Sequence, residues 1–285
     1  MHLLDLPGPA AGVLPALGLG TWRLGESRAR RAAEVGALRS ALEMGWRLID
    51  TAEMYGEGGA EEVVGEALAG ALRAGDVRRE DVVVVSKVYP HNAGRRGTPA
   101  ACERSLKRLG LERIDLYLLH WRGSVPLAET VEALQSLQAA GRIGRWGVSN
   151  FDVDDLEELV AAGGADCAAN QVWYSLGEQG PAHSLLPWMQ ARGLPLMAYS
   201  PIDQGSLSAD GELAALARGL GVSAAQLALA WLLDQPGVAA IPKAAGEAHL
   251  RENLAAADLR LDAATRAALA RLFPPPARKA PLAMI

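Results

Sequence analysis

Four residues that can move protons follow apolar stretches in the first half of the chain. The acid Asp50 closes one such stretch, and Tyr55 follows in the Gly-rich turn beyond it. Lys87 and His120 each stand at the end of a later apolar run. A buried carboxylate needs a partner, so we expect Asp50 to meet a group from a neighbouring strand end. Together the acid, phenol, amine and imidazole predict one proton-handling site.

The types of these four groups predict a chemistry. A buried Lys87 beside Asp50 stays charged because the carboxylate offsets its desolvation. An ammonium close to a phenol stabilises the phenolate, so we expect the pKa of Tyr55 to lie below the usual value of about 10. Tyr55 could then give a proton to a developing alkoxide and take it back in reverse, while His120 donates a hydrogen bond to the same oxygen. None of these groups supplies electrons, so a reduction at this site requires a hydride carrier.

The elements that must position these groups alternate between short strands and longer helices. The predicted strands are Leu17–Gly20, Arg47–Asp50, Val82–Lys87, Ile114–His120, Arg145–Ser149, Cys167–Gln171, Leu194–Tyr199 and Val238–Ile241. The predicted helices are Ala29–Met44, Ala60–Leu72, Thr98–Leu109, Leu127–Ala140, Val153–Ala161, Ser184–Arg192, Gly211–Leu220, Ser223–Leu233, Ala248–Ala256 and Ala263–Leu272. Eight strands, each followed by helix, favour a closed parallel (β/α)8 TIM barrel over an open α/β sheet. In such a barrel the carboxyl ends of the strands meet at one mouth, where active sites lie.

The two ends of the chain depart from this alternation. Residues Leu3–Leu14, with Pro7-Gly8 in their middle, predict a short hairpin that covers the bottom of the barrel. The run Pro274-Pro275-Pro276 begins a C-terminal tail, residues 274–285. No linker rich in Pro, Gly or Ser precedes it, so residues 1–285 are predicted to form one barrel domain.

Composition narrows the class of protein. Half of the 285 residues are hydrophobic, 21% are charged, and the net charge of −5 with scattered arginines argues against nucleic-acid binding. No basic segment leads into a long apolar run near the start, so no secretory signal or membrane span is predicted, and a cytoplasmic location is expected. Cys102 and Cys167 without a C-x-x-C pair indicate neither a disulfide framework nor a metal site. Nothing in the sequence indicates an obligate interface, so a monomer is expected.

The ordered set of motifs resembles the aldo-keto reductase family over nearly the whole chain. The motifs are Gly18-Leu19-Gly20-Thr21-Trp22, Asp50-Thr51-Ala52 through Tyr55-Gly56, Ser86-Lys87, Leu118-Leu119-His120-Trp121, Gly147-Val148-Ser149-Asn150-Phe151, Asn170-Gln171-Val172, Ala198-Tyr199-Ser200-Pro201 and Ile241-Pro242-Lys243. The resemblance implies that Asp50, Tyr55, Lys87 and His120 form a catalytic tetrad in which Tyr55 is the general acid. The segments 121–124 and 185–188 look similar to bacterial members that reduce methylglyoxal and other reactive aldehydes.

The resemblance also implies a nicotinamide dinucleotide that lies extended across the barrel mouth, without a Rossmann domain. Ser149, Asn150 and Gln171 would hold its carboxamide, and Tyr174 would stack on the nicotinamide ring. The other implied cofactor contacts are Gly20, Thr21 and Asp50 near the nicotinamide, Ser200, Pro201, Gly205 and Leu207 along the pyrophosphate, and Lys243, Ala244, His249, Glu252 and Asn253 at the adenosine end.

The adenosine end departs from the family pattern. Ala244 stands where a serine usually follows the lysine, and His249 stands where an arginine would grip a 2′-phosphate bidentately. A histidine is only partly charged at neutral pH. NADPH is nevertheless the predicted cofactor because Lys243 is present and most relatives use it, with NADH as the alternative.

Aromatic residues are predicted to wall the substrate pocket. Trp22, Met54 and Trp121 would line it beside Tyr55 and His120, with Trp173 as a further candidate. Such a mouth favours small or flat carbonyl compounds, such as methylglyoxal and aromatic aldehydes, over sugars, whose hydroxyl groups need more polar partners.

Two other functions fit part of the same pattern. A lysine at a barrel strand end could form a Schiff base as in an aldolase, although Asp50 would keep the Lys87 amine protonated. A cofactor-binding regulatory barrel with slow turnover is the second alternative, and the presence of all four catalytic residue types argues against it.

Overall fold

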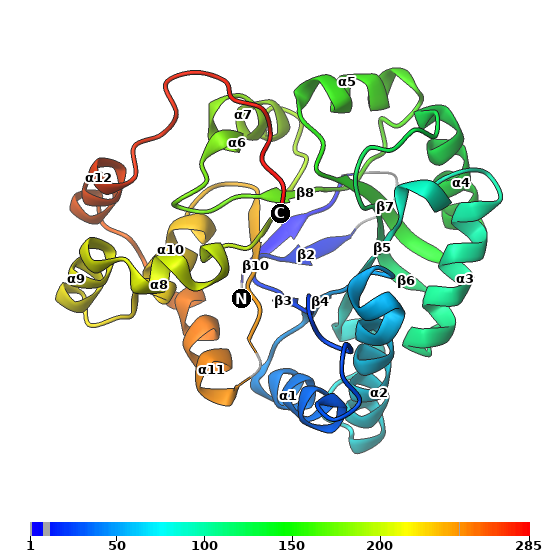
Figure 1. Cartoon of the computed structure of the whole chain (residues 1–285), viewed down its shortest axis with the longest axis horizontal. Helices are drawn as coiled ribbons and strands as arrows, with labels where there is room; N and C mark the ends of the chain where they lie inside the picture. Colours follow the sequence, from blue (N-terminus) through cyan, green and yellow to red (C-terminus); the bar gives the residue numbers. More distant parts are fainter. Residues whose placement is uncertain (1, 8–11, 245) are drawn as a thin grey trace.

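The computed structural model describes residues 2–7, 12–244 and 246–285, and its centre is an eight-stranded parallel sheet (Figure 1). The strands are β3 (Leu19–Gly20), β4 (Leu48–Asp50), β5 (Val83–Val88), β6 (Ile114–Leu119), β7 (Ile143–Ser149), β8 (Asn170–Trp173), β9 (Leu196–Tyr199) and β10 (Val238–Ile241). Each strand pairs with the next in chain order, and a parallel bridge between Leu17 and Ala240 joins the two edges. The predicted (β/α)8 barrel is therefore confirmed.

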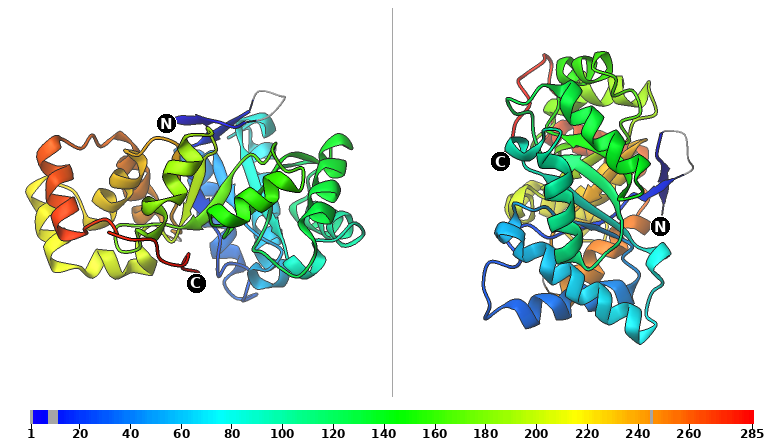
Figure 2. Two further views of the ribbon diagram at one scale, coloured as in Figure 1. Left: turned by 90° about the horizontal axis from the view of Figure 1, so that it is seen from above. Right: turned by 90° about the vertical axis from the view of Figure 1, so that its right-hand side faces the viewer.

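Helices surround the barrel on its outside (Figures 1 and 2). They are α1 (Arg31–Met44), α2 (Gly59–Ala74), α3 (Gly97–Leu109), α4 (Leu127–Ala139), α5 (Val153–Ala161), α6 (Gly180–His183), α7 (Leu185–Gln190), α8 (Ser206–Ala209), α9 (Gly211–Gly219), α10 (Ala224–Leu233), α11 (Glu247–Ala255) and α12 (Ala263–Leu272). Short 3₁₀ turns are η1 (Tyr55–Gly58), η2 (Arg79–Asp81), η3 (Pro90–Asn92), η4 (Asp203–Gly205) and η5 (Ala256–Asp258). The short helices α6 and α8 are absent from the sequence-based prediction, because four residues carry too little periodicity to indicate a helix.

Strands with two apolar faces hold the barrel together. Val84 and Trp146 point outward and pack in the core between the barrel and its helices. Val85, Leu116 and Leu118 point inward and fill the barrel. Because successive strand residues face opposite sides, burial on both sides requires the continuous apolar runs that the sequence contains.

A hairpin closes the amino-terminal end of the barrel. β1 (Leu3–Asp5) and β2 (Val13–Pro15) pair antiparallel, and Leu4 and Leu14 pack against the residues that fill the barrel. Figure 2 shows this hairpin on one side of the molecule and the C-terminal end of the chain on the other. The hairpin predicted over Leu3–Leu14 is confirmed, while the end of its Pro7-Gly8 turn lies outside the described residues.

Strand β8 differs most from its predicted bounds. It begins at Asn170, whereas Cys167–Gln171 is the predicted strand. Ala168 and Ala169 are buried, and Ala168 N–H donates to Trp146 O, but regular pairing with β9 starts only at Asn170. The shift changes which residues stand at the carboxyl end of this strand.

No single helix within the described ranges is long and apolar enough to cross a membrane. Helices α9 and α10 satisfy that criterion only as a pair, with a bend of 82° between them.

Candidate active site

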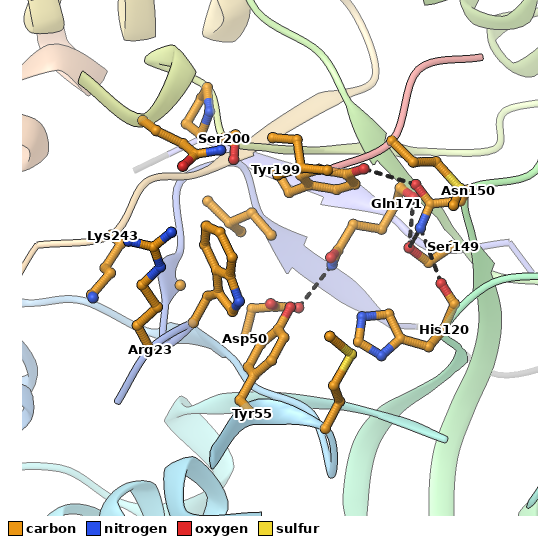
Figure 3. A pocket seen from close by; sticks show the side chains of 18 of the residues that line it. Arg23, Asp50, Tyr55, His120, Ser149, Asn150, Gln171, Tyr199, Ser200 and Lys243 are labelled. Carbon is orange, nitrogen blue, oxygen red and sulfur yellow. Dashed lines mark hydrogen bonds between the residues drawn. The ribbon is translucent and has the colours of Figure 1, made fainter. Parts of the chain in front are cut away.

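A cavity of about 410 Å³ opens at the carboxyl ends of the barrel strands (Figure 3). The predicted site residues that line it are Gly20, Trp22, Asp50, Met54, Tyr55, His120, Trp121, Ser149, Asn150, Gln171, Ser200, Pro201, Gly205 and Lys243. Lining residues that the sequence does not predict are Arg23, Tyr199, Ile202, Gln204, Ile241, Met284 and Ile285. The cavity thus brings together three of the four predicted proton-handling groups, Asp50, Tyr55 and His120, whereas Lys87 does not line it.

Lys87 lies fully buried behind the cavity at the centre of a hydrogen-bond cluster. Its Nζ donates to Asp50 Oδ2 at 2.7 Å, to Thr51 O at 3.0 Å and to Tyr55 Oη at 3.1 Å. These three acceptors use all three ammonium hydrogens. Because the Tyr55 oxygen accepts a hydrogen bond from Lys87, its own proton is free to point into the cavity.

Burial and charge compete at Lys87 and Tyr55. Burial is the largest influence on Lys87 and lowers its pKa, but Asp50 and Tyr55 outweigh it and leave the pKa of Lys87 raised. Burial is also the largest influence on Tyr55 and raises its pKa, whereas the Lys87 charge acts in the opposite direction. The expectation of a lowered pKa for Tyr55 is therefore wrong in sign, because desolvation of the phenolate outweighs the ammonium. Tyr55 is held in its protonated form.

His120 stands beside the Tyr55 phenol as a neutral imidazole. The two rings meet edge to face with centroids 5.7 Å apart, and His120 is 8% exposed. Burial, reinforced by the Lys87 charge, holds the pKa of His120 well below its ordinary value. Its Nδ1 atom is buried without a hydrogen-bond partner among the described residues. A buried polar atom without a partner is unusual in a folded protein.

Amide and hydroxyl groups line the cavity next to His120. Gln171 Nε2 donates to Asp50 Oδ1 at 2.7 Å, so the two oxygens of Asp50 are held by Gln171 and Lys87. Asn150 Nδ2 donates to His120 O at 3.1 Å, and Ser149 Oγ donates to Gln171 O at 2.8 Å. Figure 3 shows Ser149 and Asn150 together above His120, with Gln171 reaching from their side toward Asp50.

Tyr199, and not Tyr174, presents an aromatic ring to this group. Tyr199 closes β9, lines the cavity and donates its hydroxyl to Asn150 Oδ1 at 2.9 Å. Tyr174 is 1% exposed, packs against Trp231 and donates to Gln235 Oε1 at 2.6 Å. The expectation that Tyr174 stacks on a bound ring is therefore wrong. Its ring faces the core outside the barrel.

Trp173 also points away from the cavity. Its indole Nε1 donates to Asp203 Oδ1 at 2.9 Å, and it does not line the pocket. The expectation that Trp173 walls the substrate pocket is therefore wrong, whereas Trp22, Met54 and Trp121 do line it.

Two cationic side chains line the opposite end of the cavity. Lys243 and Arg23 lie together on the side away from His120 in Figure 3. Burial, reinforced by the nearby Arg23 charge, lowers the pKa of Lys243. The Arg23 guanidinium also lies 4.4 Å from the centre of the Trp22 ring. Among the described residues, no carboxylate of the cavity lining is paired with either of these two cations. They therefore favour the binding of an anionic group at this end of the cavity.

Several predicted cofactor contacts lie outside the cavity. Thr21 is buried, and both its N–H and its hydroxyl donate to Asp50 O, so it holds the Asp50 backbone in place. Leu207 lies on α8 and is buried in an apolar cluster with residues of α9 and α10. The remaining ones are Ala244, which follows Lys243, and His249, Glu252 and Asn253, which lie on α11. Their contacts with a cofactor stay a prediction.

The backbone around the cavity is strained. Six non-glycine residues in the described ranges have positive φ, and they are Arg23, Glu57, Asn150, Ser200, Asp203 and Gln204. Four of these line the cavity, and Glu57 and Asp203 stand on the loops that form its rim. Such residues cost energy and cluster at sites where function fixes the backbone.

The C-terminal tail contributes part of the cavity wall. Met284 and Ile285 line the cavity, and Leu282 packs against the main core. Lys279 Nζ lies 3.1 Å from Asp152 Oδ2, which anchors the tail at the start of α5. The sequence identifies a tail at residues 274–285 but does not indicate that it returns to the barrel mouth.

Comparisons with known proteins agree with this geometry. The family model described as "Aldo/keto reductase family" matches residues 16–272. The chain is 49% identical over 278 residues to methylglyoxal reductase YeaE from Escherichia coli (strain K12), covering 95% of each protein. It is 36% identical over 248 residues to a glyoxal reductase from Bacillus subtilis (strain 168), covering 87% of this chain.

A solved structure provides a third comparison. An aldo-keto reductase from Klebsiella pneumoniae, crystallised in complex with NADPH, matches with a TM-score of 0.93 and 47% sequence identity. That match covers 100% of both chains.

Proposed function

The chain belongs to the aldo/keto reductase family and reduces carbonyl compounds with NADPH, and we propose that Tyr55 is the general acid of this reaction. The observation that carries the proposal is the bonding of Lys87. All three of its hydrogens are committed, one of them to the Tyr55 oxygen, so the Tyr55 proton is directed into the cavity. Asp50 balances the ammonium charge, and we assign it and Lys87 to holding Tyr55 in a protonated, oriented state.

The cavity fits a nicotinamide dinucleotide. Ser149, Asn150 and Gln171 present amide and hydroxyl groups suited to a carboxamide, and Tyr199 adds a ring at the same end. At the other end, Arg23 and Lys243 suit the phosphates of an extended cofactor, as NADPH requires. When bound, the nicotinamide supplies the hydride that none of these side chains can provide.

The roles of the chain's own residues follow from their positions. The substrate carbonyl oxygen would accept hydrogen bonds from Tyr55 and from the neutral imidazole of His120, whose rings share one wall. As the oxygen gains negative charge, Tyr55 gives it a proton, and the Lys87 ammonium stabilises the phenolate left behind. His120 cannot compete as an acid because burial keeps it neutral. It therefore orients the carbonyl.

The apolar part of the cavity lining indicates the substrate class. It contains Trp22, Met54 and Trp121, together with Met284 and Ile285 from the tail. This surface offers few partners for sugar hydroxyls and favours small or flat carbonyl compounds. We propose methylglyoxal and aromatic aldehydes as substrates, and the names of the E. coli and B. subtilis relatives support the small dicarbonyl compounds among them.

The two rival functions lose support in this geometry. A Schiff base requires a free amine that can reach a carbonyl, but Lys87 is 0% exposed and its hydrogens are all engaged. A slow regulatory barrel could lack an aligned acid, whereas the Lys87-to-Tyr55 contact is intact at 3.1 Å.

The Tyr55→Phe variant tests the assignment. It removes the proton donor and keeps the ring, so methylglyoxal-dependent NADPH oxidation should fall by about 10²–10⁴-fold. NADPH binding, followed by tryptophan fluorescence, should stay within twofold of the parent. Turnover that survives in Tyr55→Phe would sink the proposed mechanism.

A further inference from the structure

Tyr89, the first residue after β5, joins that strand to both sides of the loop that carries Tyr55. Its backbone N–H donates to Glu53 Oε1 at 2.8 Å, and its phenol donates to Glu57 Oε1 at 2.9 Å. Glu53 and Glu57 stand two residues before and two residues after Tyr55. The backbone and the side chain of Tyr89 therefore hold the Tyr55 loop at two points. Tyr89 directly follows β5, the strand that carries Lys87.

The side of the loop before Tyr55 is rigidly held. Glu53 is 5% exposed and also accepts hydrogen bonds from Asn92 Nδ2 at 3.0 Å and from Arg104 Nη2 at 3.3 Å. Its backbone N–H donates to Lys87 O at 3.3 Å. A buried carboxylate with three donors stays in place. Glu53 thus fixes one end of the loop to β5 and to α3.

The side of the loop after Tyr55 has a backbone that is unfavourable without support. Gly56, Glu57 and Gly58 have φ values of 58°, 51° and 92° in succession. The two glycines accept this conformation freely, but Glu57 does not. Glu57 is exposed, and the Tyr89 phenol is the group that binds its carboxylate. This contact offsets the strain and sets the direction in which the loop leaves Tyr55.

The Tyr89 ring is itself fixed by packing. It meets Trp121 edge to face with centroids 6.0 Å apart and stacks on His91 at 4.7 Å. The phenol is therefore aimed at Glu57 by aromatic contacts that do not depend on its hydroxyl group.

We propose that Tyr89 is a positioning residue for Tyr55, which it acts on through Glu53 and Glu57. It sets the place of the Tyr55 phenol relative to the Lys87 ammonium on the neighbouring strand end. The inference rests on the proposed role of Tyr55 as general acid. A proton donor loses efficiency when it moves away from its productive position, even if its chemistry is unchanged.

The Tyr89→Phe variant isolates this role. It keeps the ring on Trp121 and the backbone bond to Glu53, and it removes only the bond to Glu57. We expect kcat with methylglyoxal to fall about fivefold, as for the loss of one typical hydrogen bond at an exposed site, with KM for NADPH unchanged. Deuterium at the transferred position of NADPH should give a larger isotope effect on kcat than in the parent, because the chemical step is slowed.

A double-mutant cycle tests whether the effect passes through Glu57. Glu57→Ala should match Tyr89→Phe, the double variant should be no slower than either single variant, and Glu57→Gln should retain most of kcat because it keeps an acceptor. Glu132→Ala is the matched control. It removes an exposed carboxylate that receives a 2.8 Å hydrogen bond from Arg95, and kcat should not change.

Three results would overturn the proposal: unchanged kcat in Tyr89→Phe, losses that multiply in the double variant, or a parallel loss of melting temperature and NADPH affinity. The last result would indicate a general structural role. A parent enzyme that turns over no aldehyde would instead overturn the function on which the proposal rests. An active parent with an unaffected Tyr89→Phe defeats the positioning alone.

Discussion

The two ends of the barrel are built on opposite principles. At the floor, the hairpin side chains Leu4 and Leu14 complete an apolar cluster with inward-facing residues such as Leu48 and Leu116. At the mouth, the loops carry buried charges, amide groups and all six non-glycine residues with positive φ that the described ranges contain. The strands run between the two ends, so one strand can contribute residues to both the floor and the mouth.

Within a single strand, residues that stabilise the fold therefore lie only a few positions from residues that serve the active site. On β4, Leu48 packs into the floor cluster, while Asp50 two residues later accepts hydrogen bonds from Lys87 and Gln171. Floor residues gain free energy by leaving water. Mouth residues hold charges and strained backbone whose energetic cost the rest of the fold must offset. Substitutions at the floor should therefore change stability, and substitutions at the mouth should change activity.

The largest effect that tests this separation is expected from Leu14→Ala. Leu14 is fully buried in the floor cluster, and its truncation leaves a cavity there. The free energy of unfolding should fall by about 2–5 kcal/mol, as measured by urea denaturation. At a temperature where the variant is folded, kcat and KM should stay within twofold of the parent. A changed KM for NADPH or substrate would show that the floor and the mouth are coupled.

A smaller and opposite effect is expected from Arg23→Gly at the mouth. Arg23 is exposed, has φ of 65° and lines the cavity beside Lys243. Glycine relieves the strain, so the free energy of unfolding should stay within about 1 kcal/mol of the parent. Loss of one cation that we propose faces the phosphates of NADPH should raise KM for NADPH about tenfold, and the variant should respond less to added salt.

Arg28→Ala provides the control for that variant. Arg28 is exposed and does not line the cavity, so its removal should leave KM for NADPH unchanged. If Arg23→Gly and Arg28→Ala raised KM for NADPH equally, the effect of Arg23 would come from the overall electrostatic field of the protein and not from a direct contact with the cofactor.

Local signals explain which parts of this organisation could be predicted from the sequence. Helix α5 and strand β10 have the predicted bounds, Val153–Ala161 and Val238–Ile241. Asp152 caps that helix in a capping box with Asp155, a signal confined to four residues. The proton-handling residues could be predicted in the same way, because each one ends or closely follows an apolar strand.

The errors arise where the answer depends on which face of a strand a residue occupies. Tyr174 and Tyr199 both stand at the carboxyl end of a strand, but Tyr174 belongs to the outer core and Tyr199 packs with the barrel interior. The role of Tyr174 is implied by the family resemblance alone, which does not say on which side of the barrel wall the ring lies, and neighbouring strand residues face opposite sides. The return of Met284 and Ile285 to the mouth depends on tertiary contacts alone.

The smallest effect is expected from His120. This residue lies at the mouth, but its imidazole makes the free energy of unfolding depend on pH. Its folded pKa lies well below the ordinary value of about 6.5, because burial disfavours the imidazolium. Below pH 6.5 the unfolded chain therefore binds a proton that the folded protein excludes. The free energy of unfolding must then fall as the pH is lowered, by at most about 1.4 kcal/mol per pH unit for one such group.

Denaturation at pH 7.5 and pH 5.5 measures this contribution. The parent should lose more stability between these values than His120→Gln, which has no imidazole to protonate. The exposed residue His183 gives the matched variant His183→Gln, which should follow the parent. Because His120 stays neutral, kcat of the parent should also show no inflection near pH 6.5. If the free energies of unfolding of the parent and His120→Gln changed in parallel with pH, the mouth would tolerate a charged imidazole. His120 would then affect activity alone, as expected for the other mouth residues.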